Sequence, residues 1–97
     1  MPTYITLVRW TDQGIRNVKE SADRYDDFKK MAEKMGCTPK GIYLVTGRYD
    51  LVLVMEGPDD VTASKVSLAV GARGAVRTET LRAFTEDEYR KIIKELP

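Results

Sequence analysis

The chain has 97 residues, of which 42% are hydrophobic and 32% are charged, a length that builds one hydrophobic core but not two. Sixteen Lys and Arg against fifteen Asp and Glu leave a net charge of +1, without the positive field that nucleic acid or an anionic membrane requires. The absence of His excludes His-dependent triads and His-ligated haem, zinc or iron sites.

The first predicted element is a strand over residues 4–10, which is rich in β-branched and aromatic side chains. It stops at residues 11–14, Thr-Asp-Gln-Gly, where a Thr or Asp side chain can cap a helix. Apolar residues then recur at steps of three and four from Ile15 to Met35. This spacing predicts a helical region that ends at Gly36, with Ser21 as the cap of a second segment.

Residues 42–46 and 51–55 are two apolar runs that flank the short connection 47–50, Gly-Arg-Tyr-Asp. They predict a hairpin of two central strands. The turn 57–60 supplies an acidic cap for a short helix through Val70, and residues 76–84 predict a fourth strand. Thr85 and Glu88 have the spacing of a capping box, which predicts a last helix that continues to Leu96.

The order βαββαβ plus a terminal helix predicts an α+β, ferredoxin-like fold over residues 1–97 as a single domain. Both helical crossovers then cover the same face of a four-stranded antiparallel sheet. The hairpin strands are apolar on both sides, since Leu51 and Leu53 alternate with Val52 and Val54. We therefore expect the uncovered face to pair with a second copy, as a homodimer or a higher homo-oligomer.

Four segments resemble the GYD-domain family over nearly the whole chain: residues 9–17, 47–50, 57–60 and 77–85. The Gly-Tyr-Asp signature is matched by Gly47, Tyr49 and Asp50, with Arg48 inserted in the turn. The resemblance implies a dimeric α+β barrel and carries no assigned activity.

Residues 46–51 and 74–80 also resemble, more distantly, the effector domains of the leucine-responsive regulators, which bind amino acids at subunit interfaces. The resemblance implies a place near an effector for Gly47 and Asp50 alone. The helix-turn-helix of those regulators has no counterpart here, so their DNA binding does not transfer.

The first candidate ligand site is the turn with Gly47, Tyr49 and Asp50. In the structural interpretation, the Asp50 carboxylate bonds to backbone amides of the hairpin and needs no ligand. In the functional interpretation, Asp50 accepts a hydrogen bond from a ligand ammonium, and Tyr49 supplies a flat wall and a hydroxyl at the mouth of an interface pocket.

The second candidate site comprises Trp10, Thr11, Asp12 and Gln13. A helix that begins after the first strand can present free amides to an anionic group. The structural alternative is a capped helix start with Trp10 packed at the edge of the core.

The leading functional hypothesis is a non-enzymatic module that binds a small, amino-acid-like ligand or mediates assembly, with no cofactor and no metal. The alternative is a cofactor-free oxygenase or isomerase with Arg9, Tyr43, Tyr49 and Asp50 around its pocket. No apolar run reaches membrane-spanning length and no signal-peptide pattern occurs, so we expect a cytoplasmic protein. A single Asn and a single Gln are typical of a heat-adapted host.

Overall fold

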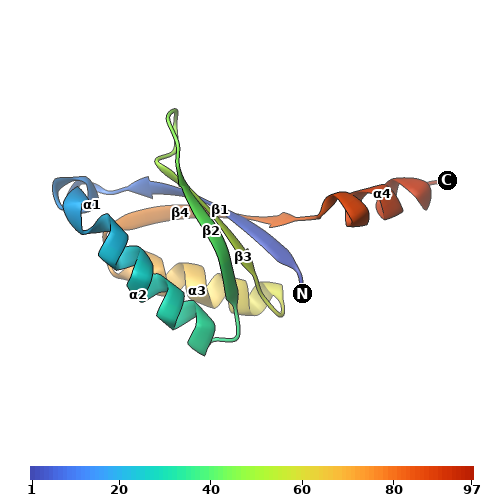
Figure 1. The fold of residues 1–97 in the computed structure, drawn as a ribbon, viewed down its shortest axis with the longest axis horizontal. Coiled ribbons are helices and arrows are strands. Elements are labelled where there is room, and N and C mark those ends of the chain that lie inside the picture. The colour runs from blue at the N-terminus through green and yellow to red at the C-terminus, as the bar shows by residue number, and fades with distance from the viewer.

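The computed structural model describes residues 1–97 as one antiparallel sheet with helices on one side (Figure 1). The strand order is β2-β3-β1-β4, and α2 and α3 are the two crossover helices. The predicted ferredoxin-like order βαββαβ is therefore confirmed. The bounds of these elements are β1 (Thr3–Trp10), β2 (Thr38–Leu44), β3 (Leu51–Glu56), β4 (Val76–Ala83), α2 (Ser21–Lys34) and α3 (Asp60–Ala72).

The first helical region is broken where the sequence contains Asn17. A short helix, α1 (Asp12–Arg16), is followed by one 3-10 turn, η1 (Val18–Glu20), before α2 begins at Ser21. Asn17 takes a non-helical conformation (φ −108°, ψ 34°), and its side-chain amide donates to the carbonyl of Gln13. A polar side chain thus competes with the helical ladder and ends α1. The prediction that Ser21 caps the second segment is wrong: the cap position is Glu20, no side chain makes a cap hydrogen bond there, and Ser21 is the first helical residue of α2.

Strand β2 differs from the prediction in both position and bounds. It lies at the edge of the sheet, so the expectation of two central strands is right for β3 and wrong for β2. It begins at Thr38 and ends at Leu44, with a register shift between Pro39 and Gly41. An edge strand tolerates a proline because one row of its amides needs no partner strand.

The covered face of the sheet carries the hydrophobic core. Tyr4, Thr6 and Val8 of β1 are buried, and so are Leu53 and Met55 of β3. The helices add their apolar stripes above this layer, with Phe28, Ala32, Ala63 and Val66 buried.

The opposite face, which we call the open face, carries two apolar rows that run across the strands. In one row Ile5 of β1 pairs with Val54 on one side and Leu81 on the other. In the second row Val52 of β3 pairs with Leu7 and Tyr43. No helix of the chain covers these rows, and Tyr43 keeps 63% of its surface exposed.

The last helix, α4 (Glu86–Lys94), projects away from the sheet at the end opposite α1 (Figure 1). Its predicted capping box is confirmed: the Glu88 amide donates to the Thr85 hydroxyl oxygen at 3.2 Å, and the Thr85 amide donates to the Glu88 carboxylate at 2.9 Å. These hydrogen bonds hold the pKa of Glu88 below its usual value. The apolar side chains of this segment stay exposed: Tyr89, Ile92, Ile93 and Leu96.

Candidate functional site

The Gly47–Asp50 turn extends the sheet beyond the ends of β2 and β3. The Asp50 amide donates to the carbonyl of Val8 at 2.8 Å, and its carbonyl accepts from the Val45 amide at 2.9 Å. The Asp50 carboxylate accepts a hydrogen bond from the backbone amide of Trp10 at 2.9 Å. Gly47 has a φ of +135°, a conformation that a residue with a Cβ rarely adopts. This turn thus fixes the position of Trp10, forty residues earlier in the chain.

Tyr49 lies on the open face. Its hydroxyl donates to the Glu79 carboxylate of β4 at 3.0 Å, and the Arg9 guanidinium lies 5.0 Å from the centre of its ring. Arg9 and Glu79 belong to the open-face set of β1 and β4, since their neighbours Val8 and Thr78 point to the helices. Tyr49 and Asp50, adjacent in sequence, therefore serve different parts of the molecule.

The segment 11–14 is used for packing against the start of β4. The Thr11 hydroxyl accepts from the Gly14 amide at 3.1 Å and donates to the Gly74 carbonyl at 2.6 Å. Gly14 is buried so tightly that a Cβ there would lie 1.9 Å from the Ala75 carbonyl oxygen. Asp12 and Gln13 remain exposed. The Gly14 amide at this helix start is thus already bonded within the chain.

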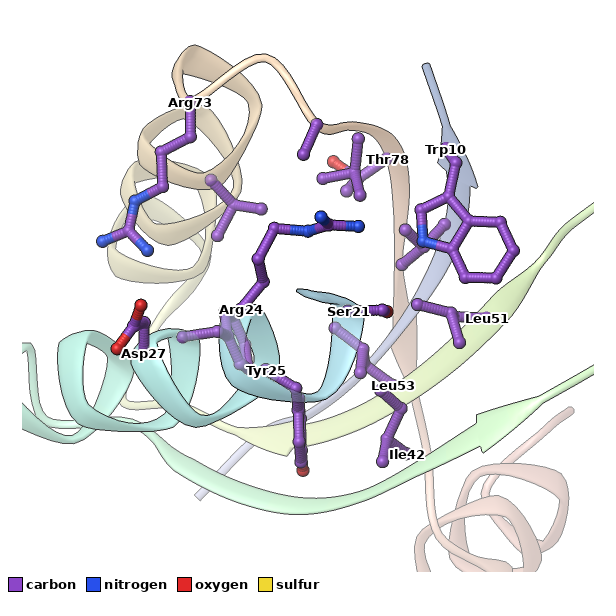
Figure 2. Close-up of a pocket in the computed structure, with 15 residues that line it drawn as sticks. Trp10, Ser21, Arg24, Tyr25, Asp27, Ile42, Leu51, Leu53, Arg73 and Thr78 are labelled. Atoms are coloured by element: carbon purple, nitrogen blue, oxygen red, sulfur yellow. The ribbon is translucent and has the colours of Figure 1, made fainter. Parts of the chain in front are cut away.

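A cavity of about 170 Å³ lies between α2, α3 and the covered face of the sheet (Figure 2). The sequence did not predict this cavity, because its presence depends on the distance between the two packed helices. Its wall is mainly apolar, and its floor is the sheet: Val8, Ile42, Leu51, Leu53, Val76 and Thr78. Trp10 lines one end of it, so one residue of the predicted set does border a cavity.

Polar groups enter this cavity from two elements, β1 and α2. The indole Nε1 of Trp10 is buried without a hydrogen-bond partner. Arg24 of α2 lines the cavity and donates to the carbonyls of Asn17 and Gly14 at 2.9 and 3.3 Å. In Figure 2 the Arg24 guanidinium and the Trp10 indole nitrogen both point into the space between the helices and the sheet.

Two buried titratable groups lie near the other end of the core. Burial and a 2.5 Å hydrogen bond to Asp60 raise the pKa of Tyr4 to about 12. Burial also raises the pKa of the Cys37 thiol, which keeps it protonated and unreactive. No cluster of three or more His, Cys, Asp or Glu side chains is arranged to hold a metal ion, and no helix has the length and apolarity to cross a bilayer.

Comparison with known proteins adds a family to this fold. The model of the GYD domain matches residues 4–93. A Thermus thermophilus protein named "Glutamine synthetase and cystathionine beta-lyase binding protein" is 34% identical over 85 residues, which cover 87% of this chain and 90% of that protein. A crystal structure of a protein from Thermus thermophilus is similar with a TM-score of 0.56 and 26% identity, over 88% of this chain and 95% of that one. The chain therefore belongs to the GYD-domain family.

Proposed function

We propose that the chain is a non-enzymatic binding module that works as a homodimer, with two copies joined through their open faces. The observation that carries this proposal is the pair of apolar rows that crosses the sheet. Each large apolar side chain left in water forgoes roughly 1.5–3 kcal/mol of burial. Two such rows on one face, with Tyr43 63% and Leu81 43% exposed, favour a permanent cover.

The charges on the open face favour a second copy as that cover. Arg9 and Glu79 lie at one end of the face, where they meet Tyr49. A Lys40–Glu56 ion pair of 3.4 Å lies on the β2–β3 pair toward the other end of the strands. A face that carries both signs at each end can pair with itself about a two-fold axis without a clash of like charges.

Helix α4 supports the same arrangement. Its apolar side chains Tyr89, Ile92 and Ile93 are each 43% to 58% exposed, although its capping box shows that it is a well-formed helix. Helix α4 follows β4 directly and projects past the sheet (Figure 1), so in the proposed dimer the second copy would be what covers it. Covering α4 would add apolar contact area to an interface between sheets.

We further propose that the dimer binds an enzyme of amino-acid metabolism in the cytoplasm, with glutamine synthetase and cystathionine β-lyase as the first candidates. The support is the name of the Thermus thermophilus relative, which describes a protein that binds these two enzymes. The alternative, catalysis at the Gly47–Asp50 turn, has no observation in its favour, because the Asp50 carboxylate and the Tyr49 hydroxyl are each engaged within the chain.

The test measures mass and enzyme binding in the same proteins. Val54→Asp places a carboxylate in an apolar row of the open face, whereas Val61→Asp makes the same change at an exposed position of α3. In light scattering we expect a dimer for the wild type and for Val61→Asp, and a folded monomer for Val54→Asp. A wild type that stays monomeric at hundreds of micromolar would refute the dimer.

Enzyme binding is then measured by titrating purified glutamine synthetase and cystathionine β-lyase, each from the host of this chain, in a calorimeter. We expect saturable binding of at least one enzyme to the wild type and to Val61→Asp. If neither enzyme binds the dimer, the proposed partner class is wrong while the dimer itself still stands.

A further inference from the structure

We propose that the cavity between α2, α3 and the sheet binds a small monocarboxylate with an apolar body about the size of a benzene ring. This site lies on the covered face, so it does not depend on the proposed dimer. Three features support this site: the volume of the cavity, an unpartnered donor in its wall and a cation in the same lining.

The volume and lining determine the body of the ligand. At about 170 Å³ the cavity is close to engineered apolar cavities of about 150 Å³ that hold benzene. Val8, Leu51, Leu53 and Val76 present aliphatic carbon from the sheet, and Phe28 and Val70 add carbon from the helices. A branched aliphatic or single aromatic group fits this lining, whereas a nucleotide or a sugar is too large and too polar.

The Trp10 indole determines the polar end. A buried N–H donor with no acceptor costs about 1–3 kcal/mol relative to one that is satisfied. Trp10 Nε1 is such a donor, and it points into the cavity (Figure 2). The bond from its amide to Asp50 holds its backbone, and its ring lines the cavity wall. A ligand atom at this end of the cavity must therefore accept a hydrogen bond.

Arg24 determines the charge of that atom. Two of its nitrogens are held by the carbonyls of Asn17 and Gly14, so the guanidinium is fixed in place rather than mobile. Its nearest carboxylate is that of Glu20, 4.0 Å away, and that side chain is 69% exposed, so the charge of Arg24 is only weakly offset. Ser21 and Thr78 add hydroxyls to the lining. These donors together match a carboxylate.

The chemistry of the lining disfavours a zwitterionic amino acid. The only carboxylate among the lining residues is Asp27, which is exposed, as is Arg73. An ammonium group inside the cavity would thus be buried without a partner, which is costly. We therefore assign the site to a carboxylic acid that lacks a free amine next to the carboxylate.

Benzoate is the probe, and the single tryptophan of the chain is the reporter. In ¹H–¹⁵N spectra the only indole N–H signal should shift in a saturable way as benzoate is added, and the thermal midpoint should rise by mass action. Toluene and benzylamine, which keep the ring but remove or reverse the charge, should bind at least about tenfold more weakly, the ratio expected when a charge-assisted bond is lost. No saturable indole shift, or toluene binding as tightly as benzoate, would overturn the proposal.

Two arginine variants locate the carboxylate. Arg24→Met should weaken benzoate binding by about tenfold or more, whereas Arg73→Met, the same change at an exposed lining residue, should leave the affinity within about threefold. A loss in Arg73→Met that equals or exceeds the loss in Arg24→Met would show that Arg24 does not bind the carboxylate and would refute the site. If Arg24→Met does not fold, Trp10→Phe serves instead, with calorimetry as the readout and an expected loss of about fivefold. Val54→Asp should bind benzoate as the wild type does, which separates this proposal from the dimer.

Discussion

The two faces of the sheet both carry apolar side chains but differ in how far the chain buries them. On β3, Leu53 and Met55 face the helices and are buried, whereas Val52 and Val54 face outward, are only half-buried and are covered by no helix. The same strand therefore contributes side chains both to the hydrophobic core and to an apolar surface that no helix covers. The alternation of apolar residues within a strand thus predicts whether one or both faces of the sheet are apolar. Which of the two faces the helices of the chain cover follows only from the topology.

A second difference concerns how completely each face is used. The covered face is packed at the Tyr4–Met55 end but leaves a cavity at the Trp10 end, between α2 and α3. The open face instead carries apolar rows, and its polar residues Arg9, Tyr49 and Glu79 gather at one end. We assign the covered face to a small ligand and the open face to a second copy.

The largest expected effect compares two neighbours on β3. Leu53→Ala should lower the free energy of unfolding by about 2–5 kcal/mol, because it removes buried carbon from the covered face. Val54→Ala should cost little in a monomer, and its cost should grow with protein concentration as the dimer forms. Denaturant melts at several concentrations distinguish the two. A concentration-dependent loss for Leu53→Ala and none for Val54→Ala would reverse the assignment of the faces.

The next prediction concerns the close contact at the Trp10 end of the covered face. Gly14→Ala should cost about 3 kcal/mol, because its Cβ would lie 1.9 Å from the Ala75 carbonyl oxygen and one of the two segments must move. Gly71→Ala is the control, since a Cβ added at this position of α3 would meet no atom of another segment within 4 Å. That control should be neutral or stabilising by up to about 1 kcal/mol. Similar losses in the two variants, measured by thermal melts, would contradict the close packing of α1 on the segment that precedes β4.

A third prediction tests the packed end of the covered face by pH. Because the pKa of Tyr4 is about 12 in the folded chain and near 10 when unfolded, the unfolded state loses its proton first as pH rises. The stability that Tyr4 contributes is thus fully present below pH 10 and is lost between about pH 10 and 12, by roughly 2 kcal/mol. Tyr4→Phe should remove this part of the pH dependence. Urea melts across that range provide the measurement, and identical slopes for both proteins would argue against a buried phenol.

The smallest effect is expected at Asp50, which joins the hairpin turn to Trp10. Asp50→Ala should cost about 1 kcal/mol by leaving the Trp10 amide without its acceptor, and Asp50→Asn should recover part of the loss through its amide oxygen. In Asp50→Ala, the affinity for benzoate should fall only if the loss of this bond displaces the Trp10 indole. An Asp50→Ala protein with unchanged stability would show that the Gly47–Asp50 turn does not hold Trp10 in place.

The features that sequence reasoning predicted are local ones. The capping box of Thr85 and Glu88 needs only residues three apart, and the helix break near Ser21 needs only a polar interruption, so both could be inferred from the chain. The apolar alternation of β3 likewise predicted an open face before the sheet order was known.

The features that it missed depend on tertiary contacts. The contact between Asp50 and Trp10 spans forty residues, and the close approach of Gly14 to Ala75 spans sixty-one. The cavity exists only because α2 and α3 pack over the sheet with a space between them, which no periodicity encodes. The edge position of β2 also follows from sheet order rather than from its own apolar run.

The pairing of open faces is tested most directly by nuclear Overhauser effects between copies. In a sample that mixes two differently isotope-labelled forms of the wild type, only contacts between chains give cross-peaks. We predict cross-peaks among the methyl groups of Ile5, Leu7, Val52, Val54 and Leu81, which form the apolar rows of the open face. Cross-peaks confined to methyl groups of α3, such as those of Val61 and Leu68, or no cross-peaks at all, would contradict the proposed dimer.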